Sequence, residues 1–281
     1  VSISRVNTTT ARLSWDAVTG VAGYRVYSDT LPYFTPVDPP IATTVGTTYD
    51  DPGALGDTTT NYYYVVRSAC ESGFQSVNSN RVGEFDFELR KTTGSDFNWI
   101  ALPLNASLQK AAELKSHIEN NSSGPLTVET IEKWNATGQT YEIFSTVPFT
   151  SGNFDLEEGG PYRVTADPAS GTTAVWTLTG DVPDPSVFSY TLRETTESDH
   201  NWIMLPLQKD NVDLASKLLP DIEANASPTV TVKAVEFWNA TAQSYQIYST
   251  EPFPTGEFTT YIGYPYRVAV DVTSGTLSIW P

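Results

Sequence analysis

The two histidines are the first side chains to consider for catalysis. A serine nucleophile activated by a base needs a histidine to accept its proton, so His117 or His200 would have to serve. The second half of the chain repeats itself at an offset of 103 to 104 residues, described below, and this offset pairs His117 with Asp221. The same comparison pairs His200 with Phe97. Neither histidine belongs to the repeated scaffold, so we interpret both as surface residues and predict no catalytic residue.

Carboxylates are the second group that could do chemistry. The densest run lies at residues 155–158 and contains Asp155, Glu157 and Glu158. Clustered carboxylates can bind calcium, and two acids facing across a cleft can hydrolyse a glycosidic bond. The run lacks the D-x-D-x-D-G pattern of a calcium loop, and the second copy has uncharged residues at 259–262. We interpret the run as a solvated acidic loop and leave open whether its three carboxylates bind calcium.

Cysteine and histidine are too few for a metal centre of the zinc type. The chain has one cysteine, Cys70, and two histidines. A structural zinc site needs about four such ligands, and a disulfide within the chain needs a second cysteine. No Gly-rich phosphate loop or dinucleotide fingerprint occurs either. The sequence therefore predicts no metal and no cofactor.

Aromatic side chains on hairpins are the strongest candidates for a binding site. Trp134 and Tyr141 recur as Trp238 and Tyr245 in the second copy. Flat rings stack on sugars, so these four residues could form two equivalent glycan platforms. The competing interpretation is core packing, because each buried aromatic removes about 150–250 Å² from water. The pattern favours a core role and leaves the platform open, and the exposure of the two tryptophans decides between them.

The chain also carries seven Asn-X-Ser/Thr triplets, which accept N-linked glycans in hosts with that machinery. Two of them occupy the same turn in both copies, from which a glycan would project outward. The competing interpretation is that Asn and Thr simply form turns here. The candidate asparagines are Asn7, Asn105, Asn120, Asn121, Asn135, Asn225 and Asn239.

Charge limits the partners. The 281-residue chain has 16 Lys and Arg against 33 Asp and Glu, for a formal net charge of −17. Such an excess of carboxylates repels phosphate, so we predict no nucleic-acid partner. No apolar run reaches the roughly 20 residues of a membrane-spanning helix, so no direct membrane span is expected. Acidity, abundant Thr and Ser and few Lys favour an extracellular or cell-surface protein. Because the chain opens directly on a strand-like segment, we expect a processed mature chain or a fragment of a longer one.

Residues 1–84 have the pattern of a β-sandwich. Apolar and polar residues alternate at 11–15 and at 24–27, and clusters of Gly, Pro and Asp separate such runs. A period of two puts alternate side chains on one face of each strand, where they face a common core. The predicted core consists of Leu13, Trp15, Tyr24, Val26, Tyr62, Tyr64 and Val66.

These residues also resemble a fibronectin type III domain. The resemblance rests on the order of LSWDAVTGVAGYRVY, TTYDDPGALGDTTTNYYYVVRSA and SNRVGEF. It implies that Trp15 is the core tryptophan of the second strand and that Tyr62 is the tyrosine-corner residue. Integrin-binding members of that family carry an Arg-Gly-Asp tripeptide before the last strand, whereas residues 70–74 here read CESGF. Integrin binding is therefore not expected.

Beyond residue 84 the chain repeats itself. NWIALPL at 98–104 matches NWIMLPL at 201–207 with an offset of 103. After one inserted residue, the WNAT and PYRV motifs of the two copies match with an offset of 104. We therefore divide the chain into a first module at 1–84, copy 1 at 85–180, a linker at 181–187 and copy 2 at 188–281.

Each copy has the pattern strand, strand, helix, hairpin and two more strands. Apolar residues at a spacing near 3.6 predict helices over 107–119 and 212–223, and Pro220 should interrupt or kink the second near its end. The hairpin of copy 1 is predicted over 131–145. The Pro-rich residues 181–185 predict a short stiff linker without regular structure. The expected fold is mainly β: a fibronectin type III-like sandwich followed by two homologous β-rich modules, each with one short helix.

The repeat motif also resembles modules of large exported or surface-anchored bacterial proteins, which often lie beside fibronectin type III domains. This resemblance implies surroundings rather than chemistry. Our leading hypothesis is a non-catalytic structural or adhesive protein of the cell surface, partnered by itself or by other surface proteins. Sheet edges could build a filament or surface array by strand addition. The alternative is a polysaccharide-binding accessory module of a larger secreted enzyme.

Overall fold

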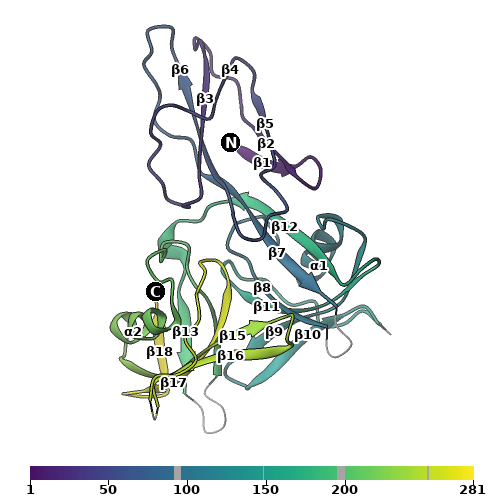
Figure 1. The fold of residues 1–281 in the computed structure, drawn as a ribbon, viewed down its shortest axis with the longest axis vertical. Helices are drawn as coiled ribbons and strands as arrows, with labels where there is room; N and C mark the ends of the chain where they lie inside the picture. The colour runs from purple at the N-terminus through teal and green to yellow at the C-terminus, as the bar shows by residue number, and fades with distance from the viewer. Residues whose placement is uncertain (92–95, 148, 195–199, 252) are drawn as a thin grey trace.

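The computed structural model describes residues 1–91, 96–147, 149–194, 200–251 and 253–281. The chain is mainly β, with 46% of residues in strands and 9% in helices, and the two helices of the described part lie within the later β regions. Neither described helix is long and apolar enough to cross a membrane. Figure 1 shows the first module at the top, with copy 1 and copy 2 side by side below it.

The first module consists of two antiparallel sheets that enclose a common core. The smaller sheet has the order β1-β2-β5, and the larger has β12-β7-β6-β3-β4, in which β12 (Thr173–Asp181) comes from copy 1. The predicted core residues Leu13, Val26 and Tyr64 are buried, whereas Trp15 and Tyr62 are only partly buried. The strands are β1 Ser2–Arg5, β2 Thr10–Ser14, β3 Gly23–Asp29, β4 Ala42–Thr44, β5 Thr48–Pro52, β6 Tyr63–Ala69 and β7 Val82–Arg90.

Strand β7 belongs to the first module and to copy 1 at once. Only its first residues pair with β6, through Tyr64↔Val82 and Tyr63↔Gly83. The whole of β7 pairs with β12 (Thr173–Asp181), the last strand of copy 1, from Val82 to Arg90. The division between residues 84 and 85 therefore falls inside one continuous strand, which runs from the first module into the copies (Figure 1).

The two copies have the same topology. Their four-stranded sheets have the orders β10-β9-β11-β8 and β16-β15-β17-β14, which correspond strand for strand. The predicted hairpin is confirmed as β9–β10, with Trp134 opposite Tyr141. The elements of copy 1 are β8 Phe97–Ala101, α1 Ala111–Asn120, β9 Leu126–Asn135, β10 Thr140–Ser145 and β11 Pro161–Pro168. Those of copy 2 are β13 Tyr190–Arg193, β14 His200–Met204, α2 Ala215–Asn225, β15 Val230–Asn239, β16 Ser244–Ser249, β17 Pro265–Val272 and β18 Leu277–Trp280.

Both helices form where the periodicity predicts them, with shifted ends. Helix α1 begins at Ala111 and buries Ala111, Leu114 and Ile118. Helix α2 continues through Pro220 to Asn225, so of the two predicted outcomes, an interruption or a kink, the interruption does not occur. Pro220 is exposed, so water can solvate the carbonyl that its missing N–H leaves without a partner.

The linker is more ordered than its proline content predicts. Residues Pro185–Val187 form a single 3₁₀ turn, η1, and the Asp184 side chain accepts a hydrogen bond from the Ser186 N–H. The Tyr33 hydroxyl of the first module donates to the carbonyl of Pro183 at 2.9 Å. The linker is therefore fastened to the first module.

One hydrophobic core runs through all three modules. It joins Tyr27 and Val65 of the first module to Phe85 and Phe87 of β7, and it reaches Met204 of copy 2. A second core lies inside copy 2, and the partly buried Ile262 and Tyr264 contact both cores. Shared burial of this kind ties the modules into one unit, because separating them would expose apolar surface to water.

Candidate functional site

The four predicted platform aromatics lie in the interface between the two copies. The Trp134 indole N–H donates to the His200 carbonyl of copy 2 at 2.9 Å. The Trp238 indole N–H donates to the Phe97 carbonyl of copy 1 at the same distance of 2.9 Å. Both tryptophans are half-buried. This exposure favours an interface role over a sugar platform.

At the centre of this interface, Trp99 of copy 1 stacks on Trp202 of copy 2. Their ring centroids are 3.3 Å apart and their planes differ by 20°. Each of these rings is only 8% exposed. The Tyr141 ring lies 6.2 Å from the Trp99 ring and the Tyr245 ring lies 6.2 Å from the Trp202 ring, centroid to centroid. The two copies thus use the same surface patch on each other, which is the arrangement of an isologous, two-fold interface.

Arginines cover the tyrosine faces that a sugar would need. The Arg163 guanidinium carbon lies 4.0 Å from the Tyr141 ring centre, and that of Arg267 lies 3.9 Å from the Tyr245 ring centre. Each guanidinium is held by a buried carboxylate, Arg163 by Glu132 and Arg267 by Glu236. A charged, hydrogen-bonded pair on the ring face leaves no open stacking surface there.

The loop before the last two strands of each copy completes the interface. Gly159 and Gly263 have φ of 71° and 77°. A Cβ at Gly159 would lie 2.8 Å from Phe188, and one at Gly263 would lie 2.4 Å from Phe85. The Gly159 loop of copy 1 therefore lies against Phe188 of copy 2, and the Gly263 loop of copy 2 lies against Phe85 of copy 1. Glycine is required because both the backbone angle and the close approach exclude a side chain.

His117 has a structural partner within the fold. His117 is half-buried, and its Nδ1 accepts the indole N–H of Trp176 at 3.1 Å. Burial lowers the pKa of His117, which favours the neutral acceptor form. Asp221 at the equivalent position accepts the indole N–H of Trp280 at 3.2 Å. His117 is thus partly exposed, and its ring carries out the same hydrogen-bonding task as Asp221.

The acidic loop at 155–158 does not gather its carboxylates. Asp155 forms an ion pair with Lys110 at 2.5 Å, and Glu157 forms one with Lys133 at 2.5 Å. Within the part of the chain that the structure describes, no three His, Cys, Asp or Glu side chains are grouped as metal ligands. Calcium binding by Asp155, Glu157 and Glu158 thus gains no support from the geometry.

The candidate glycosylation sites differ in accessibility. Asn7, Asn105, Asn120 and Asn225 are exposed, whereas Asn121, Asn135 and Asn239 are half-buried.

Some side-chain amides have a role inside the fold. Those of Asn135 and Asn239 accept backbone N–H groups two residues further on, so both form the turns that their composition suggests. Asn121 and Asn225 donate to helix carbonyls four residues earlier, which occupies the nitrogen that a glycan would modify. Glycosylation stays a prediction at the seven sites.

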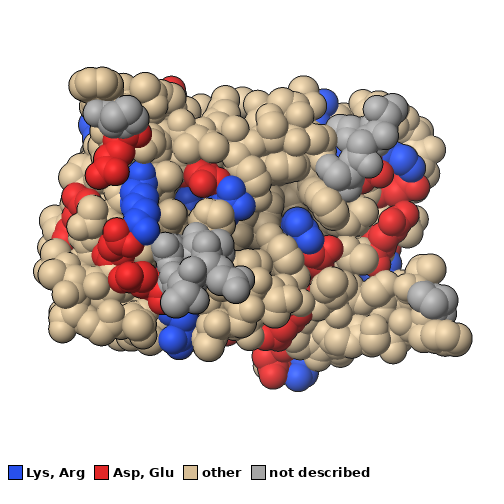
Figure 2. Space-filling model, turned by 90° about the horizontal axis from the view of Figure 1, so that it is seen from below, with Lys and Arg blue, Asp and Glu red and all other residues tan. Residues whose placement is uncertain are grey.

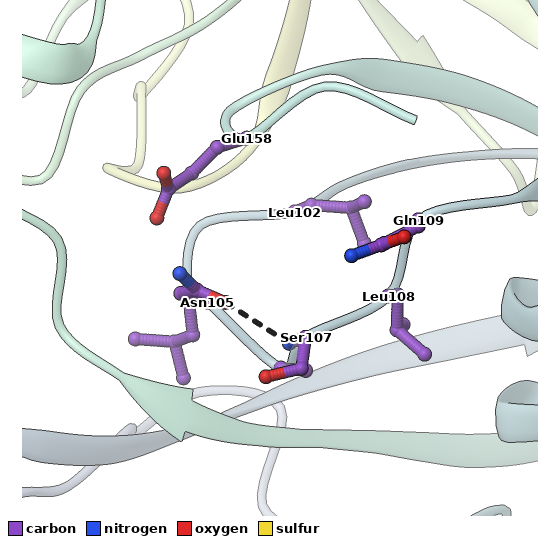
Figure 3. A pocket seen from close by; sticks show the side chains of 8 residues that line it. Leu102, Asn105, Ser107, Leu108, Gln109 and Glu158 are labelled. Carbon is purple, nitrogen blue, oxygen red and sulfur yellow. Dashed lines mark hydrogen bonds between the residues drawn. The ribbon is translucent and has the colours of Figure 1, made fainter. Parts of the chain in front are cut away.

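A shallow pocket of about 340 Å³ lies beside the acidic loop of copy 1. Figure 3 shows the Glu158 carboxylate reaching toward Asn105, with Leu108 and Gln109 across the pocket. The Asn105 side chain accepts the Ser107 N–H at 3.0 Å, which shapes the loop. Desolvation raises the pKa of Glu158. A single carboxylate among amides and leucines provides contacts for a small polar molecule but no acid and base pair.

A larger cleft of about 640 Å³ lies between the first module and copy 2. Residues 30, 31, 58–61 and 63 line it from the first module, and residues 210, 212, 237, 260–262 and 264 line it from copy 2. Sequence reasoning missed this cleft. The available signal was the replacement of the acidic loop at 155–158 by the partly aromatic 259–262 at the same place in copy 2.

Comparisons with known proteins add no relative: no protein-family model matches the chain, and no curated protein matches it. The candidate function therefore depends on the geometry of the chain itself.

Figure 2 shows Lys and Arg interspersed with Asp and Glu on the lower face, with broad uncharged areas between them.

Proposed function

We propose that this chain is a non-catalytic structural or adhesive unit of an extracellular or cell-surface protein. In this proposal the first module is a fibronectin type III-like sandwich, and the two repeats form a paired block beneath it. The single observation that supports the proposal best is the reciprocal interface centred on the Trp99–Trp202 stack. It uses the aromatic and charged residues of the repeats for assembly instead of for chemistry.

A rigid unit suits this role because it can hold a binding surface in a fixed position against force. Strand β7 is common to the first module and copy 1, and the large core includes residues of all three modules. A flexible chain of independent modules would need linkers with few contacts. The linker here is instead bonded to Tyr33.

Self-association by strand addition has limited room in the copies. At the end of β10, the backbone of Ser145 pairs with that of Ser151. At the starts of β8 and β14, the carbonyls of Phe97 and His200 accept hydrogen bonds from the opposite copy. In the first module, β5 carries Asp50 and Asp51, whereas β4 is uncharged. Strand β4 is therefore the edge that we expect to pair with a second chain. Identical edges pair in a closed dimer, so a filament would need an additional contact.

Two measurements test the proposal. Immunogold electron microscopy of the source cells should place the chain at the cell surface, and an intracellular location would overturn the proposal. Scanning calorimetry of the full chain should give one cooperative transition, because the modules share a core. Three separate transitions would contradict the rigid unit.

Sedimentation measurements test the dimer. Val45, which is 85% exposed, directly follows β4, and Val45→Lys should weaken any dimer by adding a charge at that edge. Val77→Lys, at an 87% exposed site outside the strands, is the matched control.

A further inference from the structure

The cleft between the first module and copy 2 has the composition of a ligand site. Its volume of about 640 Å³ is within the range of small-molecule sites, roughly 300–1,000 Å³. Three rings line it from copy 2, those of Phe237, Tyr261 and Tyr264, and Tyr63 lines it from the first module. Threonine hydroxyls and one amide surround these rings. We infer that this cleft binds a neutral carbohydrate, with a sugar ring stacked on Tyr261.

An unsatisfied buried hydroxyl marks the wall of the cleft. Tyr63 is 1% exposed, and its hydroxyl has no hydrogen-bond partner. A buried polar atom without a partner is costly and requires an explanation. Gln208, in an adjoining cavity that shares Leu31 and Asp210 with the cleft, has an unpartnered side-chain oxygen as well. Both atoms have almost no accessible surface, so a sugar hydroxyl would reach them only after a movement of the wall beside the cleft.

The neighbouring contacts hold the cleft in shape before any ligand arrives. The Tyr264 hydroxyl donates to the Thr58 carbonyl at 3.3 Å, which joins copy 2 to the first module. The Asn61 side-chain oxygen accepts the Asp86 N–H at 3.1 Å, so its amide nitrogen is the group left for a ligand. A preformed site loses less conformational entropy when it binds.

The ring arrangement favours stacking over enclosure of a cation. The Tyr264 ring is packed against Phe85 and Phe87, with centroid distances of 5.4 Å to each. Tyr261 is 55% exposed and therefore offers an open face. One open face suits the apolar face of a sugar ring, whereas a quaternary ammonium needs several rings around it.

Charge disfavours an anionic ligand. Among the described residues that line the cleft, Asp210 carries the only charge. A carboxylate in a chain of net charge −17 disfavours anionic ligands. Its oxygens can accept hydrogen bonds from a pair of sugar hydroxyls.

This inference rests on the proposed adhesive function and names the class of ligand for it. The full chain would be tested by titration calorimetry and saturation-transfer NMR. The probes are four neutral tetrasaccharides, built from β-glucose, α-glucose, xylose and mannose. Choline and sialic acid serve as the cationic and anionic probes. We expect at least one neutral tetrasaccharide to bind, with no binding of sialic acid.

Two variants connect any binding to the cleft. Tyr261→Ala should weaken binding by at least tenfold, and Asp210→Asn should weaken it by about threefold or more. Phe253→Ala removes a 74% exposed ring of copy 2 that does not line the cleft, and it should leave binding unchanged. Thermal unfolding of each variant checks that the fold is intact.

The outcomes separate cleanly. Binding of no tetrasaccharide, binding unaffected by Tyr261→Ala, or preference for choline would each overturn the carbohydrate site. The location of the chain at the cell surface is measured independently, so the site can fail while the structural role stands. An intracellular chain that binds sugar through Tyr261 would instead remove the adhesive role and keep the site.

Discussion

The loops that precede β11 and β17 occupy equivalent places in the two copies and face different surroundings. In copy 1 the loop is acidic and reaches solvent, where Glu157 pairs with Lys133. In copy 2 Tyr261 and Tyr264 stand at the places of Glu157 and Gly160, and this loop faces the first module. The two copies therefore share a scaffold, and these loops differ both in their residues and in the surface that they face. Positions that differ between the copies are therefore better guides to function than positions that agree.

The agreeing positions have the opposite use, because they hold the copies together. Trp99 and Trp202 make the same contacts from opposite sides, as do Trp134 and Trp238. Such matched residues allow each prediction for one copy to be checked on the other.

The largest effect should come from removing the central ring pair. Trp202→Ala should lower the free energy of unfolding by about 3–5 kcal/mol, because a buried indole leaves a cavity and an exposed partner. Trp99→Ala should cost a similar amount. The double variant should cost less than the sum of the two, by about 0.5–3 kcal/mol, since the rings contact each other. Urea unfolding followed by circular dichroism measures all three, and strict additivity would contradict the shared stack.

The next effect concerns a buried carboxyl on β7, the strand that the first module shares with copy 1. Glu84 on β7 is fully buried and accepts only the Tyr62 N–H, while its second oxygen has no partner. Burial raises the pKa of Glu84 well above its ordinary value, and the nearby Asp86 adds to the shift. The folded state therefore holds a proton that the unfolded chain releases above about 4.5, the ordinary value for glutamate. This group makes stability rise as pH falls from 7 toward that value.

Replacing this carboxyl tests the pH dependence. Glu84→Gln should raise the unfolding free energy at pH 7 by on the order of 1 kcal/mol, and the gain should shrink toward pH 4.5. Glu88→Gln, on the same face of β7 but exposed, is the control. Unfolding curves at several pH values decide the question. An unchanged gain across this range would show that Glu84 binds its proton equally in the folded and unfolded states, so that burial does not raise its pKa.

Part of this architecture follows from the sequence, and the limits have physical causes. Alternation of period two and the 3.6-residue rhythm identify strands, hairpins and helices because each element buries one face. The same rhythm cannot say whether a buried face meets its own module or another. Trp134, for example, occupies an apolar position of the strand pattern, and that pattern is the same whether its ring fills a core or bonds the His200 carbonyl across an interface. For the same reason, the pattern of β7 gives no sign that the strand serves two modules.

An effect of similar size tests the symmetry of the interface. Trp134→Phe and Trp238→Phe keep a ring against the neighbouring tyrosine and remove the indole N–H bond to the opposite copy. Both bonds are 2.9 Å long, so each variant should lose about 1–2 kcal/mol of unfolding free energy. Chemical denaturation measures the two losses side by side. A difference above about 1 kcal/mol between them would contradict the equivalence of the two halves.

The smallest effect distinguishes His117 from its counterpart Asp221. Because burial lowers the pKa of His117, the unfolded chain binds a proton near pH 6.5 more readily than the folded protein does. This residue should therefore reduce stability as pH falls through 6.5, by up to about 1 kcal/mol. His117→Gln keeps an acceptor for the Trp176 indole and cannot titrate. As the pH is lowered from 7.5 to 5.5, the unfolding free energy of the wild type should fall relative to that of this variant. A difference that stays constant would mean that protonated His117 is tolerated beside Trp176. Since Asp221 also pairs with Lys209, copy 2 meets the equivalent indole, that of Trp280, with a carboxylate that is part of an ion pair. Two chemically different acceptors thus perform one structural task, which explains how the histidine could differ between the copies without any catalytic role.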